Sequence, residues 1–206
     1  RYEGAITHFN QALELRSGYQ EALTTRGHAL LCLGDYEAAI ASYDQALELD
    51  SDDPDLWFHR GMVFKHQNQH VAAIENFQRA LAIESNSAIV WYHQGVSCLR
   101  LGDFEAAIAS FEKVIELQPD YYEAWYNRGV ALKNAGQLEA AVGSYDRALA
   151  LRPDDFRAWN NRGGVLVSLG RLEEAIQSYD RVLALKPDDQ NAQQNRAIAL
   201  KKLGGA

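Results

Sequence analysis

A 34-residue period runs through almost the whole chain and constrains the fold more than any other feature. A glycine, an alanine and an aromatic residue each keep this spacing independently. Self-similarity at a period of about 20 to 50 residues is typical of solenoids and propellers, in which each repeat is one structural unit. The three columns are Gly27, Gly61, Gly95, Gly129 and Gly163; Ala5, Ala39, Ala73, Ala107, Ala141 and Ala175; and Phe9, Tyr43, Phe77, Phe111, Tyr145 and Tyr179.

The repeats are numbered here so that Gly129 occupies position 8. With this numbering the period predicts one continuous array over residues 1–206 rather than separate domains. The array consists of a half repeat (1–19), five full repeats (20–53, 54–87, 88–121, 122–155 and 156–189) and a C-terminal capping helix (190–206).

Each repeat carries two helical patterns separated by a break. Positions 4, 7, 8 and 11 fall on one face of a first helix, and positions 17, 20, 21, 24, 27 and 28 on one face of a second. Position 15 is Gly or Asn, the residues that most readily adopt the left-handed conformation at a helix end. Asp53, Ser87, Asp155 and Asp189 are expected N-caps, and Pro54 is expected at a first helical position.

The small residues predict how the two helices pack. Gly at position 8 and Ala at position 20 allow close approach, while the Trp at position 4 and the aromatic residue at position 24 fill the space beside them. Because one helix pair cannot bury both of its apolar faces, neighbouring repeats must stack.

The segments "AWYNRGVAL" and "AAVGSYDRALALRP" of repeat 122–155 resemble the tetratricopeptide repeat family, whose pattern is W-x2-L-G-x2-Y followed by A-x3-F, A and P. Arg replaces the family's Leu at position 7. The resemblance covers residues 1–203. It implies an all-α, right-handed α-solenoid, a superhelix of antiparallel helix pairs, that serves as a non-catalytic protein-binding scaffold.

Charge and composition exclude several classes of protein. The formal charge is −8, whereas binding to nucleic acid usually requires a basic face. No apolar run reaches the ~20 residues that a membrane helix needs, so we expect neither nucleic acid nor membrane as a partner. Cys32 and Cys98 are too few for a disulfide framework and indicate a reducing, cytoplasmic location.

Arginine dominates position 7, at the edge of the packed face. Position 25 of the second helix is mostly acidic, and we expect the two to pair within each repeat, for example Arg128 with Asp146. The alternative is a ladder of arginines that binds anions. Position 7 reads Arg26, Arg60, Gln94, Arg128, Arg162 and Arg196, and position 25 reads Asp44, Gln78, Glu112, Asp146 and Asp180.

Position 6, which includes Asn127 and Asn161, lies off the packed face. In related proteins an asparagine ladder on the first helices holds the backbone of an extended peptide, and an amide suits this because it both donates and accepts hydrogen bonds. The alternative is that these asparagines lie on a solvated helix edge. Both interpretations remain open on the sequence.

The positions next to it predict a peptide groove on the first helices. Its middle is apolar, gains nothing from packing between repeats, and therefore marks a binding surface. Positions 2, 5, 6, 9, 12 and 13 carry six Lys or Arg and three acidic residues, which favours an extended partner with apolar anchors and some acidic residues. The candidate groove residues are Phe58, Met62, Lys65, Tyr92, Val96, Leu99, Arg100, Tyr126, Asn127, Val130, Lys133 and Asn161. Thr24 and His28 do not match the family's Lys/Asn clamp for a C-terminal carboxylate.

Catalytic and metal-binding motifs are not expected. His66 and His70 have metal-ligand spacing, but Asn68 breaks the helix between them, and His59 and His93 lie a full repeat apart. The sequence contains no Gly-rich phosphate loop, nucleophile elbow or HExxH motif. We therefore expect no enzyme activity, no cofactor and no metal.

The two ends differ. Residues 1–19 resemble a second helix without its first, so we expect the parent protein to extend further and the face of Ala5, Phe9 and Ala12 to support self-association. Residues 190–203 replace Trp by Gln193 and add Lys201 and Lys202, which predicts a capping helix.

The sequence thus predicts a protein–protein interaction scaffold that binds an extended peptide or protein segment. Two alternatives remain: a non-catalytic segment of a larger enzyme or signalling protein, and a nucleic-acid-binding solenoid.

Overall fold

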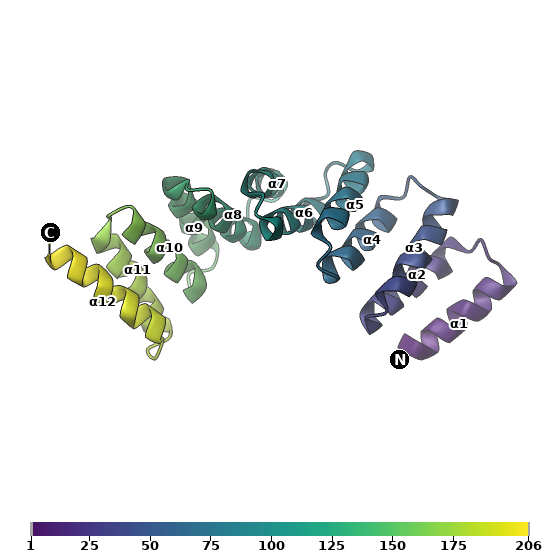
Figure 1. The fold of residues 1–206 in the computed structure, drawn as a ribbon, viewed down its shortest axis with the longest axis horizontal. Coiled ribbons are helices and arrows are strands. Elements are labelled where there is room, and N and C mark those ends of the chain that lie inside the picture. Colours follow the sequence, from purple (N-terminus) through teal and green to yellow (C-terminus); the bar gives the residue numbers. More distant parts are fainter. Residues whose placement is uncertain (1, 206) are drawn as a thin grey trace. The chain divides into compact units, whose positions relative to one another are not determined.

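The computed structural model describes residues 2–205 as twelve α-helices joined by short turns, with no β-strand in that range (Figure 1). Two helices per repeat are therefore confirmed. The helices are α1 (Tyr2–Leu15), α2 (Gln20–Leu33), α3 (Tyr36–Leu49), α4 (Pro54–His66), α5 (His70–Ile83), α6 (Ala88–Leu101), α7 (Phe104–Leu117), α8 (Tyr122–Asn134), α9 (Leu138–Leu151), α10 (Phe156–Ser168), α11 (Leu172–Leu185) and α12 (Gln190–Gly204).

The chain divides into two compact halves, residues 1–102 and residues 103–206. In the N-terminal half each helix from α1 to α5 packs against the next, and α4 also touches α2 and α6. The C-terminal half repeats this scheme from α7 to α12, with α10 touching α8 and α12. Figure 1 shows the helices of each half following one another in chain order. Within each half the first helices of adjacent repeats therefore contact each other: α2 with α4, α4 with α6, α8 with α10, and α10 with α12.

The break at position 15 has the backbone conformation that the sequence predicts. Asn68 has a φ of 59° and is the only non-glycine residue with a positive φ between residues 2 and 205. Asp53, Asp155 and Asp189 cap their helices through side-chain hydrogen bonds, whereas Ser87 occupies the N-cap position without one. The glycines at position 15 behave like Asn68, with φ values of 81° at Gly34, 79° at Gly102, 78° at Gly136 and 73° at Gly170.

In repeats 20–53, 54–87, 122–155 and 156–189 the core forms where the position-8 glycine meets the aromatic ring at position 24. A Cβ atom on Gly129 would lie 2.7 Å from Cε1 of Tyr145, so no larger residue fits without a shift. Tyr145 and the equivalent Phe77 are completely buried, as is Ala141 at position 20. The predicted close approach of the two helices is confirmed.

The tryptophans at position 4 fill less of the core than we expected. They are half-buried, and the fully buried neighbours are instead at position 3, such as Ala124 and Ala158. Each indole N–H forms a hydrogen bond with the loop before its helix. Nε1 of Trp125, for example, donates to the carbonyl oxygen of Pro119 at 2.8 Å. Gln193, which replaces Trp in α12, makes the same bond to Pro187 at 2.9 Å. The side chain at position 4 therefore holds the preceding loop in place through a hydrogen bond, as well as covering the core.

The expected Arg–Asp rung within each repeat is wrong. Arg128 pairs at 2.7 Å with Glu112 of the preceding repeat, not with Asp146 of its own. Asp146 instead binds Arg162 of the following repeat at 2.6 Å. The first helix lies between two second helices, and position 7 faces position 25 of the earlier one. Pairing with the preceding repeat also occurs between Arg60 and Asp44 and between Arg196 and Asp180.

The two terminal helices differ in burial. No residue of α1 is buried, and Ala5, Phe9 and Ala12 are half-buried. In α12, by contrast, Ala192 and Ala199 are completely buried. The predicted helix at the C-terminus therefore packs against α11 through these residues and also touches α10.

Candidate functional site

The predicted groove residues all lie on first helices, and we call the surface formed by positions 2, 5, 6, 9, 12 and 13 the first-helix surface. Contacts of α4 with α2 and α6, and of α10 with α8 and α12, make it continuous within each half. All the predicted groove residues except Arg100 are half-buried, and Arg100 is exposed. In the N-terminal half they are Phe58, Met62, Lys65, Tyr92, Val96, Leu99 and Arg100, and in the C-terminal half Tyr126, Asn127, Val130, Lys133 and Asn161.

Aromatic residues form the centre of this surface in the N-terminal half. The ring centroid of Phe58 lies 6.0 Å from that of Phe77 and 5.7 Å from that of His93 in the next repeat. Met62 packs against the same core cluster. The expectation that these positions gain nothing from packing between repeats is therefore wrong for Phe58, because its ring joins two repeats. Its half-buried ring also presents an apolar surface to a partner.

Histidines that are far apart in the sequence come together on this surface. The rings of His28 and His59 lie 4.1 Å apart between centroids, edge to face. Burial, followed by the nearby His28, lowers the pKa of His59 to about 4, against the opposing charge of Asp55. The imidazoles are therefore neutral at pH 7. The sequence analysis considered only the 34-residue spacing of His59 and His93. It did not predict the contact of His59 with His28, because His28 occupies position 9 rather than position 6.

Lys65 reaches across to the next repeat. Its Nζ lies 3.3 Å from Nδ1 of His93, whose pKa burial lowers to about 4, with the charges of Lys65 and His66 acting in the same direction. The ammonium group of Lys65 donates this hydrogen bond, and Nδ1 of the neutral imidazole accepts it. Burial and the charge of Arg100 in turn lower the pKa of Lys65.

In the C-terminal half the first-helix surface is built on a tyrosine–asparagine pair. Nδ2 of Asn161 donates to the hydroxyl oxygen of Tyr126 at 2.9 Å. Arg157 lies over the same ring, with its guanidinium carbon 5.7 Å from the centroid. Position 6 of one repeat thus orients position 5 of the preceding repeat, a link that the sequence analysis missed.

A depression of about 280 Å³ adjoins this pair. The side-chain oxygen of Asn160 is buried and has no hydrogen-bond partner within residues 2–205. A buried acceptor of this kind is destabilising unless a donor reaches it. The depression is lined by Tyr126, Phe156, Arg157, Asn160, Asn161, Asp189 and Asn191.

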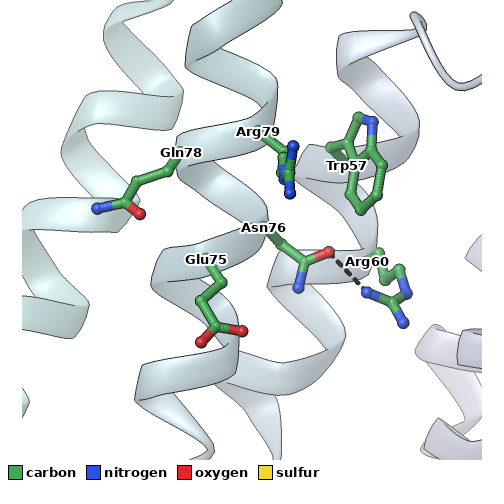
Figure 2. A pocket seen from close by; sticks show the side chains of 6 residues that line it. All are labelled: Trp57, Arg60, Glu75, Asn76, Gln78 and Arg79. Atoms are coloured by element: carbon green, nitrogen blue, oxygen red, sulfur yellow. Dashed lines mark hydrogen bonds between the residues drawn. The ribbon is translucent and has the colours of Figure 1, made fainter.

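A second kind of depression lies between the two helices of a repeat. A space of about 470 Å³ is lined by residues that include Trp57, Arg60 and Arg79. Figure 2 shows these side chains and the hydrogen bond that Arg60 donates to Oδ1 of Asn76, which is 3.0 Å long. An equivalent space of about 450 Å³ adjoins Trp159, where Arg181 lies 5.6 Å from the indole centroid. Arg79 and Arg181 both occupy position 26, and this recurrence is the feature of the sequence that could have predicted these depressions. Arg60 also pairs with Asp44, so the positive charge at this depression is partly neutralised. The side chains that line it therefore contribute to the packing of the repeats.

Two further findings concern the part of the chain that the structure describes. Within residues 2–205, no three His, Cys, Asp or Glu side chains lie close enough to hold a metal ion. No helix in this range is both long and apolar enough to cross a membrane.

Protein-family comparisons match most of the array. Models described as "Tetratricopeptide repeat" match residues 92–155 and 131–190, and residues 54–87; one described as "TPR repeat" matches residues 27–68. No curated protein matches the sequence significantly.

Solved structures of similar fold include YrrB, described as a TPR protein with an unusual peptide-binding site. It is 24% identical, with a TM-score of 0.82 over 92% of this chain and 97% of YrrB. MamA from Desulfovibrio magneticus RS-1 is 19% identical, with a TM-score of 0.78 over 83% of this chain and 97% of MamA. A chain of the APC/C hetero-tetramer Cut9-Hcn1 is 20% identical, with a TM-score of 0.67 over 97% of this chain and 40% of that one. The TM-scores establish a shared fold.

Proposed function

Because the chain belongs to the tetratricopeptide repeat family, we propose that it is a non-catalytic scaffold that binds an extended peptide or protein segment along its first-helix surface. The main support is the depression beside Tyr126 and Asn161, which contains an amide acceptor without a partner. A peptide N–H or a side-chain amide would satisfy Asn160. YrrB, of similar fold, is described as having a peptide-binding site.

The bound segment would combine apolar anchors with acidic residues. Phe58, Met62 and Tyr92 offer half-buried apolar surface, and Lys65 and Arg100 lie beside them. In the C-terminal half Tyr126 and Val130 provide the apolar surface, and Lys133 the charge. Asn127 is half-buried at position 6 and is proposed to hold the peptide backbone.

The free thiols support a reducing environment. Cys32 is exposed and Cys98 is buried, and neither is part of a disulfide. On this basis we propose a cytoplasmic location for the scaffold. The half-buried face of α1, with Ala5, Phe9 and Ala12, remains the proposed route of self-association.

The function is tested by selecting binders from a random peptide library with the intact chain and titrating them against variants. Tyr126→Ala should weaken binding about thirtyfold or more, as loss of an aromatic anchor costs ~2 kcal/mol. Asn127→Ala should weaken every peptide by a similar small factor, since one backbone hydrogen bond contributes ~0.5–1.5 kcal/mol. Lys113→Ala, on the second helix α7, is the matched control. Selected peptides whose affinities are unchanged by Phe58→Ala, Tyr126→Ala and Asn160→Leu would refute this location.

A further inference from the structure

Two cations lie at the C-terminal ends of α4 and α6. Lys65 is half-buried in the last turn of α4, and Arg100 is exposed in the last turn of α6. Within residues 2–205 neither forms an ion pair with a carboxylate. The chain as a whole has a formal charge of −8, so acidic residues are plentiful. The lack of an ion pair distinguishes Lys65 and Arg100 from Arg128 and Arg162, which are paired.

Three histidines interact with these cations or with one another, since the charges of Lys65 and His66 both act on His93 and those of Arg100 and Lys65 both act on His70. His93 accepts a hydrogen bond from Lys65 at 3.3 Å, and His66 stacks on Tyr36 with ring centroids 6.4 Å apart. His70, at the start of α5, has a pKa lowered by burial and then by the charges of Arg100 and Lys65. The side chains from α4, α5 and α6 therefore share one positive potential.

Neither helix ends nor packing account for this arrangement. Cations in a last helical turn are stabilised by the helix dipole, and long side chains can extend into water. Arg100 is exposed and follows that pattern. The pKa of Lys65 is nevertheless lowered, by burial and then by Arg100, so its surroundings disfavour the charged form. A protonated Lys65 lacks a counter-ion there, and an incoming anion would relieve this.

We propose that Lys65 and Arg100, with His93 beside them, form a binding site for a doubly charged oxyanion. The group would be a phosphoryl group or two adjacent carboxylates on the segment bound by the scaffold; this source rests on the proposed function, whereas the anion site itself does not. Arg would bind oxygen atoms through its planar guanidinium and Lys as a point charge. The imidazoles of His66, His70 and His93 would sense the bound charge.

The test uses the intact chain and inorganic phosphate. Imidazole proton signals are followed by NMR near neutral pH, against sodium chloride at matched ionic strength. Signals of His66, His70 and His93 should shift and saturate, while the signal of His8 on α1 should not. Lys65→Met and Arg100→Gln should each weaken phosphate binding about tenfold or more, because hydrogen bonds to charged groups are strong. Lys113→Met, which removes a cation paired with Glu116 at 2.7 Å, should leave it unchanged.

Succinate and acetate distinguish the sources. Tighter binding of phosphate indicates a phosphorylated segment, and tighter binding of succinate indicates paired acidic residues; either supports the site. Acetate that binds as tightly as both would overturn the requirement for a double charge. Shifts that do not saturate, or that persist in both variants with unchanged circular dichroism, would overturn the site. Because no peptide is used, failure of this site is distinguishable from failure of peptide binding.

Discussion

Arg128 links three consecutive helices of the C-terminal half. Its guanidinium pairs with Glu112 on α7 at 2.7 Å and donates to the hydroxyl of Ser144 on α9 at 2.8 Å, while its own backbone belongs to α8. Glu112 lies sixteen residues before Arg128 and Ser144 sixteen residues after it. One side chain thus joins the two helices of its own repeat to the preceding repeat, which is the coupling between neighbours on which a repeat array depends.

This geometry predicts which charged residues are energetically coupled. A double-mutant cycle of Arg162→Gln with Asp146→Asn should give a coupling of up to ~1 kcal/mol, because the pair is partly exposed. The cycle of Arg162→Gln with Asp180→Asn is the matched control and should give ~0 within error. Chemical denaturation of the four proteins in each cycle measures both. If only Arg162 and Asp180 were coupled, the Arg–Asp pair within one repeat would be correct after all.

The glycine–aromatic contact predicts opposite effects for two glycines of one repeat. Gly129→Ala should destabilise the protein by ~1–3 kcal/mol, since the new methyl group would overlap the buried ring of Tyr145. Gly143→Ala meets nothing within 4 Å on the helix α9 and should stabilise by ~0.5–1 kcal/mol. Thermal unfolding of both variants measures the difference. Equal and small effects would show that helix α8 moves away from Tyr145 at little cost.

The burial of the two large residues in neighbouring helices predicts their order of importance. Phe77→Ala should cost ~3–5 kcal/mol because the ring is completely buried. Trp91→Ala should cost less, ~1–3 kcal/mol, since the indole is half-buried and donates to the carbonyl oxygen of Ser85 at 2.8 Å. Hydrogen exchange in the N-terminal half should register both losses. A larger effect at Trp91 would mean that position 4 dominates the core after all.

The pKa values of His59 and His93 predict a pH dependence of stability. Burial lowers both to about 4 in the folded protein, from an ordinary value of 6.5. The unfolded chain therefore binds protons first, so stability is complete above pH 6.5 and is lost as pH falls towards 4, by at most ~1.4 kcal/mol per histidine and pH unit.

All six histidines lie in the N-terminal half, and the C-terminal half is an internal control. Hydrogen exchange at pH 7 and at pH 5, corrected for intrinsic rates, should show weaker protection at pH 5 between residues 20 and 102. His59→Gln with His93→Gln should remove most of that difference. Equal loss of protection in both halves would assign it to carboxylates instead.

The positions of the helices and the core contacts could be predicted because they depend on local spacing. Asn68 and Gly136 end helices through their own backbone conformations, and Gly129 is small wherever position 8 meets a ring. These features act within one repeat, and the same residue types recur every 34 residues along the chain. They could therefore be identified from the sequence.

Partners across repeat boundaries could be decided only by the tertiary structure. Position 25 offers Arg128 one acid in its own repeat, Asp146, and another in the preceding repeat, Glu112, and residue spacing treats both as plausible. The first helix packs between two second helices, and this packing brings Glu112 to Arg128 and Asp146 to Arg162. The bond from Asn161 to Tyr126 and the approach of Lys65 to His93 arise in the same way. A period determines what recurs along a chain, but the angle and offset at which neighbours stack determine which side chains meet.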